Sequence, residues 1–99
     1  MSAAFAEVQD FLKALSNETR QQIVLGVFGD GRERTVNEVA EAAGIGQSTA
    51  SEQLAILKRG GVLTARRAGK EVYYRPDRAR ILASLRRLTD IVASCCPEE

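Results

Sequence analysis

The chain has 99 residues, of which 44% are hydrophobic and 27% are charged, and its formal net charge is +1. This length predicts one small domain over residues 1–99, because it leaves no room for a second core. No stretch is long and apolar enough to cross a bilayer. The first fifteen residues lack the basic region and continuous apolar run of a secretory signal. We therefore expect a folded cytoplasmic protein with no membrane partner.

Basic and acidic residues are unevenly distributed along the chain. Residues 1–57 contain four basic and eight acidic side chains, whereas residues 58–99 contain ten basic and five acidic ones. Between Lys58 and Arg80, eight basic residues stand against two acidic ones. A basic stripe on an acidic body is typical of a protein that binds a polyanion. A solvated charged face gives the same pattern, so the charge alone does not separate the two interpretations.

The first third of the chain predicts two helices. Apolar residues at three- and four-residue spacing predict the first helix from Ala4 to Leu15. Ser16 or Asn17 would cap the second helix, which runs from Glu18 to about Phe28. The Gly29-Asp30-Gly31 stretch would end it.

Two further helices follow in close succession. Thr35-Val36-Asn37-Glu38 is a capping box, and it starts a short helix that ends at Ala43 before Gly44. The next helix is predicted from Gln47 to Arg59, and Gly60 and Gly61 would stop it. Four apolar residues would pack these two helices together: Ala40, Ile45, Leu54 and Leu57.

A basic hairpin and a last helix complete the pattern. The hairpin is predicted from Val62 to Arg67, with a turn at Ala68-Gly69-Lys70 and a second strand from Glu71 to Arg75. Tyr73 and Tyr74 alternate in that strand, so one is expected in the core and the other partly exposed. Pro76-Asp77 would start a last helix from about Arg78 to Ala93. The result is a mainly α (α+β) winged helix-turn-helix with about five helices and a two-stranded hairpin.

This architecture predicts double-stranded DNA as the partner. Polar side chains at the start of the Gln47–Arg59 helix can reach base edges in a major groove, and a basic hairpin can contact phosphates. Ser48 and Thr49 could instead cap the helix, and Glu52 either reads a base or faces away. Arg20 and Lys58 are further candidates for backbone contacts. The predicted DNA-binding residues are Gln47, Ser48, Thr49, Ser51, Glu52, Gln53, Arg66, Arg67 and Lys70.

The apolar faces of the first and last helices predict a symmetric homodimer. A three-helix motif with one hairpin cannot bury both faces, so we expect Phe5, Phe11, Leu85, Leu88 and Ile91 to leave an exposed patch on a monomer. The alternative is that both helices pack only on their own core. The predicted interface residues are Phe5, Val8, Phe11, Leu12, Leu85, Leu88, Ile91 and Val92.

Three stretches together resemble the ArsR/SmtB family of bacterial winged-helix repressors. They are FLKALSNETRQQIVLGVF at 11–28, TVNEVAEAAGIGQSTASEQLAILKRGGVL at 35–63 and RRAGKEVYYRP at 66–76. The resemblance covers nearly the whole chain. It implies a homodimer that binds an imperfect inverted repeat near a promoter, and an inducer that weakens DNA binding. Glu52 departs from the family pattern, in which a His often stands near this point.

The usual metal sites of that family have no counterpart in this sequence. Thr35-Val36-Asn37 stands where thiolate sensors of the family carry Cys-x-Cys, and the chain has no His for the site on the last helix. The remaining sulfur ligands are Cys95 and Cys96. They could bind a thiophilic metal or metalloid, form a redox pair, or be inert tail residues. A regulator without its own effector site, acting as an activator or with a separate sensor protein, is the alternative function.

Other classes of function are less consistent with the sequence. The chain has no His, no Gly-rich phosphate loop, and no Ser or Cys nucleophile beside a base, so we do not expect an enzyme. A winged helix used for protein contacts would expose apolar residues on the Gln47–Arg59 helix. The polar residues at its start favour DNA binding instead.

Overall fold

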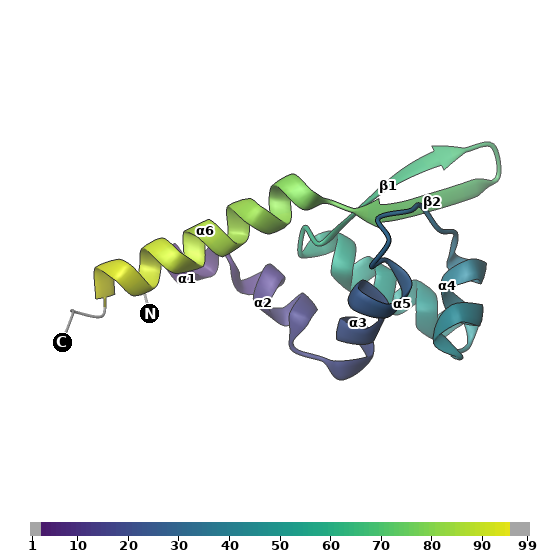
Figure 1. The fold of residues 1–99 in the computed structure, drawn as a ribbon, viewed down its shortest axis with the longest axis horizontal. Helices are drawn as coiled ribbons and strands as arrows, with labels where there is room; N and C mark the ends of the chain where they lie inside the picture. The colour runs from purple at the N-terminus through teal and green to yellow at the C-terminus, as the bar shows by residue number, and fades with distance from the viewer. Residues whose placement is uncertain (1–2, 96–99) are drawn as a thin grey trace.

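Figure 1 shows the computed structural model of the chain, which describes residues 3–95. Helices lead into a two-stranded hairpin and a last long helix, which confirms the predicted winged helix-turn-helix. None of the helices within the described residues is long and apolar enough to cross a bilayer. The elements are α1 (Ala3–Ala6), α2 (Gln9–Leu15), α3 (Glu18–Gln22), the π-helix η1 (Ile23–Val27), α4 (Val36–Ala43), α5 (Gln47–Arg59), β1 (Leu63–Ala68), β2 (Glu71–Pro76) and α6 (Arg78–Cys95).

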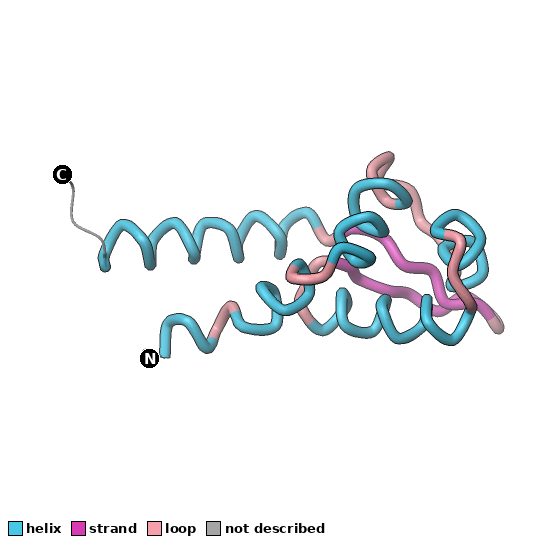
Figure 2. Tube along the Cα trace, turned by 90° about the horizontal axis from the view of Figure 1, so that it is seen from below, coloured by secondary structure: helices cyan, strands magenta, loops and turns pink. Residues whose placement is uncertain are grey.

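The molecule is elongated, with principal extents of 50 × 25 × 24 Å. Figure 1 shows why: α6 extends away from the body that contains the hairpin and α3 to α5. The turned view in Figure 2 shows the same helix running out beside the N-terminal segment. The arm formed by α1 and α6 is therefore less enclosed than the rest of the chain.

The two N-terminal helices differ from the prediction in detail. The helix predicted from Ala4 to Leu15 is broken at Val8, whose φ of −113° and ψ of 6° leave the helical region. The second helix has the predicted start and span, but its last turn is a π-helix in which the Phe28 N–H donates to the Ile23 carbonyl at 3.0 Å. The apolar spacing did not reveal either change, because the apolar residues around the break and the π-helix are still buried. They are Val8, Phe11, Ile23 and Phe28.

The core lies where α2, η1, α4 and α5 meet the start of β1. The predicted packing is confirmed, since Ala40, Leu54 and Leu57 are buried and Ile45 packs against them. The capping box is also confirmed: Thr35 Oγ1 accepts from the Glu38 N–H, and Glu38 Oε1 accepts from the Thr35 N–H. These contacts fix α4 against α5 as a helix-turn-helix unit.

The end of α5 is held close to α2 at a glycine. Gly60 is buried, and a Cβ atom there would lie 2.6 Å from the Asp10 carbonyl oxygen and 2.7 Å from the Ala14 Cβ. Gly61 follows with a φ of +76°, which L side chains rarely adopt. The predicted stop of the helix at this pair is confirmed, and the close approach explains why the first position must lack a side chain.

The hairpin is antiparallel and pairs Leu63 with Pro76 and Ala68 with Glu71. Its turn is therefore the two residues Gly69 and Lys70, one fewer than predicted. Arg34 pairs with Tyr74 through two main-chain hydrogen bonds of 2.8 Å, which ties the segment before α4 to β2. The hairpin is thus anchored to the helical body along one edge.

The last helix starts without a loop after β2. The Asp77 N–H donates to the Val62 carbonyl at 2.9 Å, and the Asp77 carboxylate accepts from the Arg80 N–H at 3.1 Å. Asp77 thus closes the hairpin with its main chain and caps α6 with its side chain. The helix continues to Cys95, two residues beyond the predicted end.

The close approach at Gly60 leads to a stability prediction. We expect Gly60→Ala to lower the free energy of unfolding by about 1–3 kcal/mol, because the added methyl group overpacks the α2–α5 contact. Urea denaturation followed by circular dichroism would measure it. Gly26→Ala is the matched control, since nothing lies within 4 Å of a Cβ there. An equal loss in both variants would contradict the steric explanation.

Candidate nucleic-acid interface

The N-terminal half of α5 presents a polar surface. Ala50, Leu54 and Leu57 face the core, so the residues between them on the helical wheel face outward. Gly46 is the N-cap and no side chain caps this end, which contradicts local capping by Ser48 or Thr49. The first N–H groups of α5 therefore point out of an open helix end. The exposed residues of the predicted set are Gln47, Ser48, Thr49, Ser51 and Glu52.

Gln53 is half-buried because Arg20 holds its side chain. The Arg20 Nη1 donates to the Gln53 Oε1 at 2.8 Å. The same guanidinium donates from Nε to the Ala14 carbonyl and from Nη2 to the Lys13 carbonyl, each at 2.9 Å. Only 7% of Arg20 is exposed, so its prediction as a DNA backbone contact was wrong. Its donors are used inside the protein, where they tie the end of α2 and the start of α3 to the middle of α5.

The start of α5 is also tied to α4. The Gln47 Nε2 donates to the Asn37 Oδ1, and both residues are exposed. This contact leaves the Gln47 amide oxygen available as an acceptor. Lys58 is exposed near the far end of the same helix.

The hairpin brings its three predicted basic residues to the surface, but they differ in whether they form an ion pair. Arg66 pairs with Glu33, with Nε at 2.6 Å from Oε2 and Nη2 at 2.8 Å from Oε1. Its guanidinium carbon also lies 4.8 Å from the centroid of the Tyr73 ring. Within residues 3–95, no ion pair engages Arg67 or Lys70. Arg67 and Lys70, together with the exposed Arg75 of β2, are the basic side chains of the hairpin that make no ion pair among the described residues.

The two tyrosines of β2 have the predicted division. Tyr74 packs against the core. Tyr73 is half-buried beneath the Arg66 guanidinium. The alternation of a strand was enough to place the two tyrosines on opposite sides. Nothing in the sequence indicated the pairing of Glu33 with Arg66, because the two residues are 33 positions apart.

Two carboxylates beside this surface are held in their charged form. The hydrogen bond from Arg66 lowers the pKa of Glu33, and the positive charges of Arg66 and Arg75 add to the effect. The hydrogen bond from Arg34 and the backbone N–H of Arg32 likewise lower the pKa of Asp30. Both carboxylates are therefore ionised at neutral pH and offset part of the basic charge near the hairpin.

The predicted dimer residues separate into buried and exposed groups. The expectation that Phe11 and Ile91 would be exposed on a monomer was wrong, since they are 4% and 6% exposed and pack within their own chain. Val8 is likewise buried. The exposed apolar residues of α6 are Leu85 and Val92, at 46% and 56%. Three others are half-buried: Phe5, Leu12 and Leu88.

An open hollow runs along α6, lined by Leu85, Leu88, Thr89, Val92 and Ala93. Cys95 ends the same helix and is exposed, whereas Cys96 lies outside the described residues. Within the part of the chain that the structure describes, no three His, Cys, Asp or Glu side chains gather closely enough to hold a metal ion.

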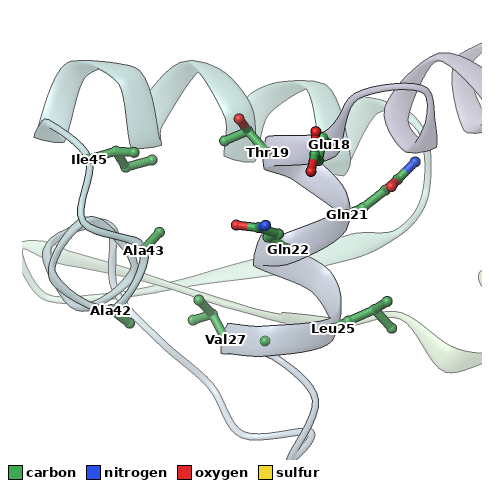
Figure 3. Close-up of a pocket in the computed structure, with 10 residues that line it drawn as sticks. Glu18, Thr19, Gln21, Gln22, Leu25, Val27, Ala42, Ala43 and Ile45 are labelled. Atoms are coloured by element: carbon green, nitrogen blue, oxygen red, sulfur yellow. The ribbon is translucent and has the colours of Figure 1, made fainter.

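A second hollow lies between α3–η1 and the turn after α4 (Figure 3). Its volume is about 760 Å³, and Ala42, Ala43 and Ile45 form one wall. Leu25 stands on the other wall and is 77% exposed. The sequence did not predict this groove, because its walls come from helices whose separation depends on tertiary packing.

The ion pair between Arg66 and Glu33 can be tested by titration. We expect the Glu33 carboxyl to titrate below the usual glutamate range, because the guanidinium stabilises its charged form. The folded pKa lies below the unfolded one, so the pair stabilises the fold above the unfolded pKa. That contribution is lost as the pH falls through the folded pKa. Carboxyl-carbon NMR would measure it.

In that titration, Arg66→Ala should raise the pKa of Glu33, and Arg67→Ala should leave it low. An identical Glu33 pKa in the wild type and in Arg66→Ala would contradict the assigned cause.

Comparisons with known proteins agree with this geometry. A helix-turn-helix domain family matches residues 15–66. An HTH-type transcriptional regulator of Mycobacterium tuberculosis is 43% identical over 81 residues, which cover 79% of this chain and 35% of the relative. The biofilm growth-associated repressor of Xylella fastidiosa is 38% identical over 74 residues, covering 75% of this chain and 63% of the relative. The chain thus spans between about a third and two thirds of these relatives.

A solved structure gives the same result over a longer stretch. It is the solution structure of the homodimeric winged helix-turn-helix DNA-binding domain of a possible ArsR-family transcriptional regulator from Mycobacterium bovis. The two folds match with a TM-score of 0.71 and 37% identity, covering 97% of this chain and 86% of the other. The chain therefore belongs to the ArsR/SmtB family of winged helix-turn-helix transcriptional regulators.

Proposed function

We propose that this protein is a sequence-specific DNA-binding transcriptional regulator that acts as a homodimer. The observation that carries the proposal is the polar, open start of α5 beside a hairpin that presents Arg67 and Lys70, neither of which makes an ion pair among the described residues. In this arrangement α5 lies in a major groove and the hairpin contacts the neighbouring backbone. The role is binding, with no catalytic step.

The chemistry of α5 suits both parts of a DNA contact. Gln47 retains an amide oxygen, and Glu52 can accept a hydrogen bond from the amino group of cytosine. Ser48 and the free N–H groups of the first turn can donate to phosphate, which the positive end of the helix dipole also favours. Gln53 contributes less, because its oxygen already accepts from Arg20.

The exposed residues of α6 and the homodimeric state of the Mycobacterium bovis domain support the proposed homodimer. Leu85 and Val92 are large apolar side chains at the surface, and Leu88 lies between them. We propose that residues 1–99 form one domain and that α1 and α6 pair with those of a second copy. A two-fold dimer fits an inverted repeat.

Repression is the favoured direction of regulation, since two of the matched relatives are named repressors. A repressor of this kind covers promoter DNA and acts in the cytoplasm, where the bacterial chromosome lies.

The proposed contacts of the hairpin, which is the wing of the fold, predict how the affinity for DNA depends on salt concentration. Each lost phosphate contact should reduce the slope of log K against log salt by about 0.9, or about 1.8 when both copies of a dimer lose it. We expect this flattening for Arg67→Ala and for Lys70→Ala, measured by fluorescence anisotropy on a labelled duplex. Arg59→Ala, at the far end of α5, is the basic control. Unchanged slopes in both wing variants would contradict the proposed contact.

The proposed dimer predicts a change in mass. Leu85→Asp and Val92→Asp should shift the protein to monomers, because a buried carboxylate would lack a partner in an apolar interface. Analytical ultracentrifugation would measure the shift. Leu25→Asp is the matched control, since Leu25 is an exposed apolar residue that lies in η1 and not in α6. A dimer that survives both α6 changes would exclude this interface.

A further inference from the structure

Arg66 and Arg67 are neighbours in β1 but occupy opposite sides of the hairpin. Arg66 pairs across the strands with Tyr73, and Arg67 pairs with Val72. Because paired residues share a side of the sheet, the Arg66 side chain lies over Tyr73 and away from that of Arg67. The Arg34–Tyr74 main-chain bonds place the Glu33 segment directly beside β2. Arg66, Tyr73 and Glu33 thus follow one another across three adjacent stretches of backbone.

The contacts of Arg66 hold its side chain along this surface. The guanidinium faces the Glu33 carboxylate with two parallel hydrogen bonds of 2.6 and 2.8 Å, and it also lies 4.8 Å from the Tyr73 ring centroid. A carboxylate and a phosphate present similar pairs of oxygens to the arginine fork. The edge of Arg66 that would grip a phosphate is therefore already occupied by Glu33.

We propose that Glu33 withholds Arg66 from DNA, acting as an internal substitute for phosphate that limits the affinity of the wing. The inference rests on the proposed DNA-binding function. In the complex, Arg67 and Lys70 contact the backbone while Arg66 stays paired over Tyr73. The negative charge of Glu33 also lies close to the DNA path, so the same residue removes one cation from the contact and adds a repulsion.

The role of Glu33 can be tested in a variant whose hairpin stays folded. The hairpin is anchored independently by the Arg34–Tyr74 main-chain bonds and by the packing of Tyr74 on the core. Glu33→Gln should therefore release Arg66 and leave the hairpin folded, which circular dichroism and the thermal midpoint would check. Phosphate contacts are independent of sequence, so a duplex of arbitrary sequence is a sufficient probe.

The test compares the salt dependence of binding in five forms of the full chain. We expect Glu33→Gln to bind more tightly and to steepen the slope of log K against log salt by about 0.9 per subunit, since the freed arginine gains a phosphate. Arg66→Ala should leave the wild-type slope unchanged. The double variant Glu33→Gln/Arg66→Ala should lose the extra slope. Glu71→Gln is the matched control, because it removes one carboxylate charge from the hairpin itself, and Glu71 has no ion pair among the described residues.

Two results would overturn the withholding of Arg66 while leaving DNA binding intact. One is a flatter slope in Arg66→Ala, which would mean that Arg66 already contacts phosphate in the wild type. The other is an equal gain in Glu33→Gln and Glu71→Gln, which would reduce the effect to net charge. If no form binds any duplex, the proposed function itself fails, and the withholding fails with it.

Discussion

A single buried guanidinium joins the elements on which the recognition helix depends. Arg20 donates to two carbonyls at the end of α2 and to the Gln53 side chain of α5, so three helices share one set of hydrogen bonds. Both carbonyls lie in the last turn of α2, and the Lys13 carbonyl also accepts from the Ser16 N–H and hydroxyl, at 3.2 and 2.8 Å. Removing the guanidinium would take away the buried hydrogen bond to the Ala14 carbonyl, which is costly. The orientation of α5 thus rests on a polar contact as well as on apolar packing.

The charges on the surface are separated along the fold. Acidic residues dominate the helices before α5, whereas the hairpin is basic. A long-range ion pair between Glu33 and Arg66 joins these two halves. Net charge near zero therefore reflects compensation between surfaces, and the local field at the hairpin depends on which cations stay unpaired. Among the described residues, those cations are Arg67, Lys70 and Arg75.

Local signals predicted most of the fold. The bounds of α5 follow from Gly60 and Gly61, and the start of α4 follows from a capping box, because both signals act within a few residues. The break at Val8 and the π-turn before Phe28 were missed, since apolar spacing cannot distinguish these backbones from a continuous α-helix. The candidate site was predicted as a set of residue types. Its internal partners were not, because Arg20–Gln53 and Arg66–Glu33 each span 33 residues and arise only from tertiary packing.

The direct passage from β2 into α6 has a geometric consequence. Asp77 is bonded to the hairpin by its main chain and to α6 by its side chain, so no flexible loop separates the wing from the arm. If two copies meet along α6, the angle between their arms would fix the distance between the two wings. That distance would determine how many base pairs separate the two half-sites that one dimer can contact. A ligand or a chemical change near the end of α6 that altered this angle would then change which half-site spacing the dimer fits. No residue that contacts DNA would need to change.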